Sequence, residues 1–139
     1  IKNAKLKDAN LTGASLYKVD FTGADLSTAI LKDVDIRDSI INFYEANLTE
    51  ADLSGINFSN ANFFNSTLVR TNLADVNLTG VDLELANLTG ANLTNTNLTN
   101  ANLHFTNFTD AIIMNTDFTD TYWYQTIWTD HMAYDENQG

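Results

Sequence analysis

A large apolar residue, usually leucine or phenylalanine, returns every five residues through almost the whole chain. This period fits neither the 3.6-residue repeat of an α-helix nor the two-residue repeat of a β-strand. A chain that turns once in each repeat can keep all of these side chains inside, so the sequence predicts a solenoid of short turns. The series consists of Leu6, Leu11, Leu16, Phe21, Leu26, Leu31 and Ile36, then Phe43, Leu48, Leu53, Phe58, Phe63, Leu68, Leu73, Leu78, Leu83, Leu88, Leu93, Leu98, Leu103, Phe108, Ile113, Phe118, Trp123 and Trp128.

The residues around each central apolar residue follow one pattern. A small or β-branched residue stands two positions before the centre, as at Ala91, and Asn or Asp stands one position before it, as at Asn92. Thr or Ser follows the centre, and then comes Gly, Asn or Asp, which tolerate the positive φ of tight turns. The central residue and the small residue are the only consistently apolar positions, so both are expected to point inward.

The pattern resembles the pentapeptide repeat family, whose motif reads A-(D/N)-L-x-x. The segments at 51–55 (ADLSG) and 91–95 (ANLTN) match it outright, and 25 such units cover residues 4–38 and 41–130. The resemblance implies an all-β fold, a right-handed quadrilateral β-helix with four units per coil and about six coils. Residues 1–139 are then expected to form a single β-helix domain, with a C-terminal cap or tail at about 129–139.

One break in the register is visible. Ile36 and Phe43 are seven residues apart instead of five, so two extra residues lie within about 37–41 and predict a bulge at a corner. If four units make one coil, residues 20 apart stack, or 22 apart across the bulge. Phe21, Phe43 and Phe63 are then expected to form one column of stacked rings.

The charge of the chain is unevenly distributed. Residues 1–38 carry six basic and six acidic residues, whereas residues 39–139 carry Arg70 against twelve acids, for a net charge of −11 overall. Such a surface repels nucleic acid and anionic membranes and attracts a basic protein. No segment is apolar enough to span a membrane. The chain begins at Ile1 in step with the repeat, which leaves room for a targeting segment upstream, so the compartment stays undetermined.

The residues needed for most chemistry are missing. The chain has no cysteine, and its two histidines, His104 and His131, stand in no spacing typical of a metal site. No nucleophile and base can be paired, and no glycine-rich phosphate loop is present. The sequence therefore predicts no catalytic residue, no metal ion, no cofactor and no small-molecule substrate.

Two sets of residues are candidates for contact with a partner protein or a second copy of the chain. The first is an apolar stripe on one face of the expected rod, which a folded-back tail or crowded corners would alternatively cover. The second is an aromatic group near the C-terminus, which serves either as a lid over the last coil or as a dimer interface. The stripe comprises Tyr44, Phe64, Leu85, Phe105 and Tyr124, and the end group comprises Tyr122, Trp123, Trp128 and Tyr134.

Two functions are compatible with these features. The first is a non-catalytic structural or protein-interaction module, which is what the resemblance to asparagine-rich, loop-free cyanobacterial members of the family implies. The second is an acidic mimic of DNA that binds DNA gyrase or another type II topoisomerase, as some family members do. The neutral first 38 residues, the short array and the absence of long loops argue against the mimic.

Overall fold

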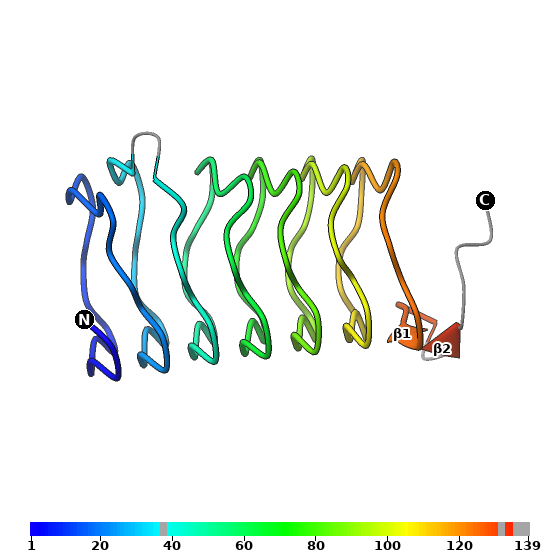
Figure 1. Ribbon diagram of the computed structural model, residues 1–139, viewed down its shortest axis with the longest axis horizontal. Coiled ribbons are helices and arrows are strands. Elements are labelled where there is room, and N and C mark those ends of the chain that lie inside the picture. The colour runs from blue at the N-terminus through cyan, green and yellow to red at the C-terminus, as the bar shows by residue number, and fades with distance from the viewer. Residues whose placement is uncertain (37–38, 131–132, 135–139) are drawn as a thin grey trace.

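The chain winds into a rod in which residues 20 positions apart lie side by side (Figure 1). The computed structural model describes residues 1–36, 39–130 and 133–134. Within each circuit four residues, five positions apart, form parallel bridges to the next circuit, for example Asn62 with Asp82 and Thr67 with Asn87. Each wall contributes one bridged residue, so the parallel pairing consists of isolated bridges and the coil has four walls.

A tight turn joins each wall to the next. The N–H of the fourth turn residue donates to the C=O of the central residue, as Ala91 does to Leu88 at 2.9 Å. The third turn residue has a positive φ, for example Gly90 at 66° and Asn95 at 57°. This combination is typical of type II turns, and it explains why Gly, Asn and Asp recur at this position.

The Asn-x-Thr pattern has a structural role in these turns. The Asn92 side-chain oxygen accepts hydrogen bonds from the N–H of Thr94 at 3.1 Å and from its hydroxyl at 2.7 Å. Asn87 and Thr89 repeat the arrangement. In each such unit the Asn side chain on the wall therefore stabilises the turn that follows that wall.

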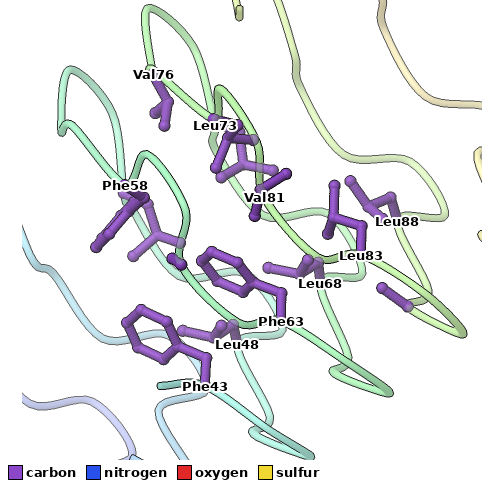
Figure 2. Close-up of a cluster of buried hydrophobic side chains, with 14 of the residues drawn as sticks. Phe43, Leu48, Phe58, Phe63, Leu68, Leu73, Val76, Val81, Leu83 and Leu88 are labelled. Carbon is purple, nitrogen blue, oxygen red and sulfur yellow. The ribbon is translucent and has the colours of Figure 1, made fainter. Parts of the chain in front are cut away.

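The central side chains fill the interior of the coil (Figure 2). The predicted column of phenylalanines is confirmed, because Phe21 and Phe43 stack with centroids 5.2 Å apart, and Phe43 and Phe63 stack at 4.7 Å. Phe58, on another wall, meets both Phe43 and Phe63 edge to face. Burying each of these large side chains contributes about 1.5–3 kcal/mol, which offsets the entropy lost in ordering so many turns.

Threonine replaces alanine at several of the small inward positions without leaving a polar group unpaired. The Thr71 hydroxyl donates to the C=O of Leu48, and the Thr96 hydroxyl donates to the C=O of Leu73, both at 2.7 Å. In each case the acceptor belongs to a central residue of the preceding coil. These two threonine hydroxyls therefore add links between coils, whereas the buried hydroxyl of Ser66 at the same inward position has no hydrogen-bond partner.

The register of the bridges changes once. Ser15 bridges Asp35, 20 residues on, whereas Asp20 bridges Asn42, 22 residues on. The two additional residues thus lie between Asp35 and Asn42, and from Asn42 onward the spacing is again 20. Of the predicted bulge residues, Arg37 and Asp38 lie outside the described residues.

The C-terminal end of the rod carries a different pairing. Strand β1 (Thr126–Ile127) pairs antiparallel with β2 (Ala133–Tyr134), so that Thr126 is opposite Tyr134 and Ile127 is opposite Ala133. Figure 1 shows both strands at the end opposite the N-terminus. The rest of the predicted tail beyond residue 130 lies outside the described residues.

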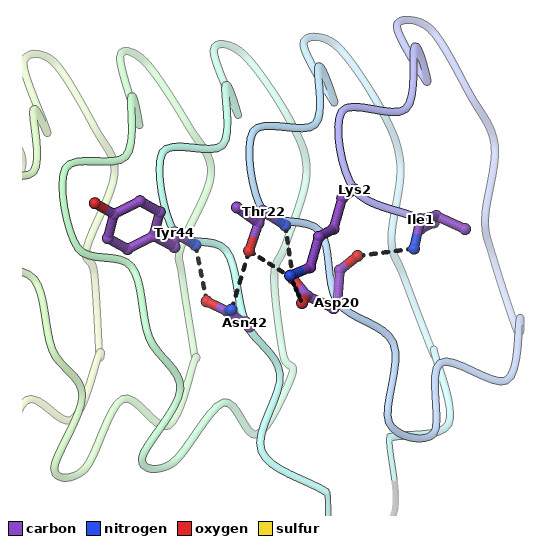
Figure 3. A network of polar contacts seen from close by, with 6 residues as sticks. All are labelled: Ile1, Lys2, Asp20, Thr22, Asn42 and Tyr44. Atoms are coloured by element: carbon purple, nitrogen blue, oxygen red, sulfur yellow. Dashed lines mark hydrogen bonds and ion pairs between the residues drawn. The ribbon is translucent and has the colours of Figure 1, made fainter.

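A polar network links the first three coils on one wall (Figure 3). The Asp20 carboxylate accepts hydrogen bonds from the N–H and hydroxyl of Thr22, and it forms an ion pair with Lys2 at 3.3 Å. Asn42 extends the network by donating to the Thr22 hydroxyl at 3.0 Å. The hydrogen bonds from Thr22, helped by Lys2, lower the pKa of Asp20 from 3.8 to about 2.

This shift predicts a loss of stability in acid. The pKa of Asp20 is lower in the folded state than in the unfolded chain, so its stabilising effect is complete above about pH 4 and disappears as the pH falls towards 2. Asp20→Asn retains a side-chain oxygen that accepts from Thr22 but removes the titration. Thermal unfolding followed by circular dichroism should therefore show a shallower decline for Asp20→Asn than for wild type between pH 4 and pH 2. Parallel declines of the two proteins would contradict this assignment.

Candidate functional site

The apolar stripe lies along a corner of the rod. Its five residues follow the central residues Phe43, Phe63, Leu83, Leu103 and Trp123, which are stacked in one column. The sequence analysis placed the stripe on a face, but the turn hydrogen bonds Ala46 N–H to Phe43 C=O and Ala86 N–H to Leu83 C=O put it in the turns at the end of that wall. The stripe therefore protrudes as a ridge.

Aromatic contacts divide the stripe into two pairs and a centre. Tyr44 and Phe64 stack with parallel rings and centroids 5.4 Å apart, and Phe105 and Tyr124 meet edge to face at the same separation. Leu85 stands between the two pairs along the rod. Leu85 is 45 % exposed and Phe105 is 40 % exposed, while Tyr44 and Phe64 are partly buried.

Hydrogen bonds between coils hold the backbone of the ridge. The N–H of Phe105 donates to the C=O of Tyr124 at 2.8 Å, and the N–H of Leu85 donates to the C=O of His104 at 3.0 Å. The N–H of Glu45 reaches the C=O of Phe64 in the same way. Hydrogen bonds to the neighbouring coils thus hold the stripe residues at a regular spacing of one coil.

Leu85 and Phe105 adopt a backbone conformation that disfavours large side chains. Their φ angles are 61° and 57°, in the left-handed region. Asn65 occupies the same turn position one coil earlier with φ of 53°, and Gly23 occupies it near the N-terminus. A residue with a Cβ loses about 1–2 kcal/mol in this region unless its side chain bonds locally, as Asn and Asp do. Neither burial nor backbone preference accounts for the two apolar residues, so their exposed surface is the feature to explain.

Polar groups flank the centre of the stripe. Glu84 and His104 occupy the second turn position beside Leu85 and Phe105. The Glu84 carboxylate accepts a hydrogen bond from Asn102 at 3.1 Å. At the first pair, the negative charge of Glu45, followed by partial burial, raises the pKa of the Tyr44 hydroxyl. The flanks are therefore acidic while the ridge itself is apolar.

The aromatic residues at the C-terminus divide into an inner and an outer set. Trp123 and Trp128 meet edge to face with centroids 4.4 Å apart, and Trp128 stacks on Phe108 at 5.1 Å. Both tryptophans are partly buried and pack against the hydrophobic core. Tyr122 is 59 % exposed on the outer surface. Tyr134 lies in β2, where its backbone is opposite Thr126, and its side chain is outside the described part.

Several exposed apolar residues were not singled out from the sequence, among them Ile30, Ile112 and Met114. Ile112 is 51 % exposed on a wall separate from the stripe, and Met114 is 63 % exposed in the turn that follows that wall. Ile112 stands one position before a centre, where Asn or Asp is usual, and this departure from the motif was the signal that could have revealed it. Leu85 and Phe105 also depart from the motif, because the third turn position is otherwise Gly or a polar residue among the described turns.

The described residues contain no cluster of three His, Cys, Asp or Glu side chains that could hold a metal ion. Over the same part of the chain there is no helix of the length and apolarity that crossing a bilayer requires.

The conformation of Leu85 predicts an unusual response to substitution. Leu85→Asn relieves the positive-φ strain but removes apolar surface that is only partly buried, so the free energy of unfolding should stay unchanged or rise by up to about 1 kcal/mol. The reciprocal change Asn65→Leu, at the same turn position, should lower it by about 1 kcal/mol. Chemical denaturation measures both. A loss above about 2 kcal/mol for Leu85→Asn would instead show that Leu85 is a packing residue.

Comparison with known proteins identifies the family. The family model "Pentapeptide repeats" matches the chain in 8 copies, over residues 1–39, 41–80 and 82–120. No curated protein matches the chain significantly.

Several solved structures are similar to the chain. HetL from the cyanobacterium Nostoc sp. Strain PCC 7120, involved in regulation of heterocyst differentiation, is 19 % identical over 96 % of this chain and 93 % of its own, with a TM-score of 0.38. QnrB1, a plasmid-mediated fluoroquinolone resistance protein, is 22 % identical over 91 % and 71 %, with a TM-score of 0.46. A pentapeptide repeat protein of the Arabidopsis thaliana thylakoid lumen is 30 % identical over 87 % and 69 %, with a TM-score of 0.22. With the family model matching most of its length, the chain belongs to the pentapeptide repeat family.

Proposed function

We propose that this chain is a non-catalytic protein-interaction module that binds another protein through its apolar stripe. The observation that carries the proposal is the exposure of Leu85 and Phe105 at turn positions where their backbone conformation is unfavourable. An exposed apolar side chain held against its backbone preference is a cost to the free chain. Burial of that side chain against a partner offsets the cost.

The solenoid suits such a role because its interior and its surface are independent. The inward positions pack the coil, and the turn positions project from it, so the residues of the ridge can vary without disturbing the core.

We further infer that residues 1–139 form one right-handed domain of about six coils ending in a tail at about 129–139, which the family resemblance supports.

The geometry of the ridge favours a protein over a sugar or a base. The rings of Tyr44 and Phe64 stack on each other with an interplanar angle of 4°, so one face of each ring is already occupied. Stacking of a sugar or a base needs a free ring face. Ring edges and a leucine side chain instead fit the apolar surface of another protein, and the net charge of −11 opposes binding of nucleic acid or an anionic membrane.

A stripe variant and a matched control test this proposal. The variant Leu85→Asn/Phe105→Asn removes apolar surface from the ridge, and Ile112→Asn/Met114→Asn removes a similar amount from another wall and the turn that follows it. Each protein is immobilised and exposed to extract of the organism that encodes it. We expect a protein that is retained by wild type and by the control variant and reduced at least tenfold on the stripe variant. Equal retention by all three proteins would contradict docking through the stripe.

The alternative function, a DNA mimic, is disfavoured by the density of charge. Residues 51–109 carry Asp52, Asp75, Asp82 and Glu84 against Arg70, a net charge of −3. These residues make three coils of ~4.8 Å each, and duplex DNA of the same length, about 14 Å, carries about eight phosphate charges. The middle of the rod is therefore much less charged than the duplex that it would imitate.

A supercoiling assay separates the two functions. We expect purified DNA gyrase to supercoil a relaxed plasmid at the same rate with and without micromolar concentrations of this protein. The same assay is repeated with a fluoroquinolone present. Inhibition of supercoiling, or protection of the enzyme from the drug, would favour the DNA mimic.

A further inference from the structure

The stripe reads the same in both directions along the rod. In chain order its residues are Tyr44, Phe64, Leu85, Phe105 and Tyr124, so a leucine is flanked first by phenylalanine and then by tyrosine on each side. Each residue belongs to a successive coil, and no register change occurs between Asn42 and Tyr122. The residue types are therefore symmetric about Leu85 in steps of one coil, although Tyr44, Phe64 and Tyr124 occupy the second turn position and Leu85 and Phe105 the third.

We propose that the stripe binds the stripe of a second copy of this chain, with the two rods antiparallel and Leu85 on the two-fold axis. This inference rests on the proposed function and names the partner. A two-fold interface requires a surface that is complementary to itself. About an axis through Leu85, Phe64 faces Phe105 of the second copy, and Tyr44 faces Tyr124 of the second copy.

The turn positions of the residues allow the rings to fit beside one another. Phe64 and Tyr44 occupy the second position of their turns, whereas Phe105 occupies the third. Phe105 of the second copy therefore comes to lie over Asn65 and beside Phe64, offset by about one residue, ~3.3 Å. Rings offset in this way interdigitate, and edge-to-face or offset contacts are the preferred aromatic geometries.

The register with Leu85 on the axis uses the whole stripe. It places each of the five apolar residues at the same level along the rod as an apolar residue of the second copy, with the two tyrosines on opposite sides of the axis, two residues or ~7 Å apart. A shift by one coil, which places the axis between Leu85 and Phe105, leaves Tyr44 without an apolar counterpart among the described residues. With Leu85 on the axis, the two Glu84 side chains lie on opposite sides of the axis. They are two residue positions, about 7 Å, apart and remain hydrated at the edge of the contact.

Charge and size set the strength of the contact. Each copy carries a net charge of −11, so the two rods repel at low ionic strength. A single ridge also buries less area than a standard stable interface. The structure thus leads to a weak, reversible dimer that strengthens as salt screens the repulsion. Docking of a basic partner has the opposite dependence, because salt weakens attraction between unlike charges.

Sedimentation velocity tests the self-association. Wild type, the stripe variant Leu85→Asn/Phe105→Asn and the control Ile112→Asn/Met114→Asn are compared from about 10 to about 500 µM at low and high salt. We expect wild type and the control to shift from monomer to dimer with rising concentration, at least threefold more readily at high salt, and the stripe variant to stay monomeric. Wild type that stays monomeric throughout, or a stripe variant that dimerises equally, would overturn the proposal.

Cysteine cross-linking tests the orientation and the register. The chain has no cysteine, so each introduced thiol is unique. Leu85→Cys should form a disulfide-linked dimer on oxidation, because a residue on a two-fold axis lies opposite itself. A mixture of Phe64→Cys and Phe105→Cys chains should form the mixed dimer in preference to either like dimer. Met114→Cys, in the turn after another wall, should stay monomeric. Preferential linkage of Phe64→Cys to itself would overturn the antiparallel arrangement.

The two proposals fail in different ways. If the chain stays monomeric and forms no cross-link, but the stripe variant retains less of a protein from the extract than wild type, the proposal of a dimer is wrong. Docking of another protein through the stripe then stands. If the chain dimerises and no other protein depends on the stripe, the second copy is the partner. If neither occurs, both proposals are wrong.

Discussion

The whole structure depends on hydrogen bonds between coils that join residues about 20 positions apart. The N–H of Leu83 donates to the C=O of Asn102 at 2.9 Å, and the N–H of Asn102 donates to the C=O of Val81 at 2.9 Å. Repetition of this pair of bonds along the rod sets the rise of every coil and stacks equivalent side chains directly over one another. The inner columns and the polar ladders on the walls are consequences of this spacing, as is the apolar stripe.

Because equivalent residues of successive coils stack, the repeat in the sequence produces continuous columns of side chains. A phenylalanine at one centre packs against the next centre of the same column, so Phe43 contacts Phe21 and Phe63 with nearly parallel rings. The interior is filled by such columns, and the turns outside are free of packing demands. This separation allows a corner to carry residues such as Leu85 and Phe105, which contribute little to the core.

Much of the fold followed from the five-residue period together with the family resemblance. The inward and turn positions followed from counting along the chain, because the repeat leaves few other ways to bury the central residues. The column of Phe21, Phe43 and Phe63 also needed the four units per coil that the resemblance implied. The candidate site was less predictable. Counting identified the five stripe residues but placed them on a face, since a period of five does not say where a wall ends and a turn begins. It also missed Ile112 and Met114, which are isolated departures from the motif.

The sequence by itself determined which side chains point inward and where the turns fall. Periodicity and composition act through local turns, and local turns depend only on nearby residues. The tertiary structure decided what depends on neighbouring coils. It left Leu85 and Phe105 exposed, stacked Tyr44 on Phe64, and packed the partly buried Trp123 and Trp128 against each other. These facts arise from contacts between residues about 20 positions apart or between adjacent walls, so no local pattern in the sequence contains them.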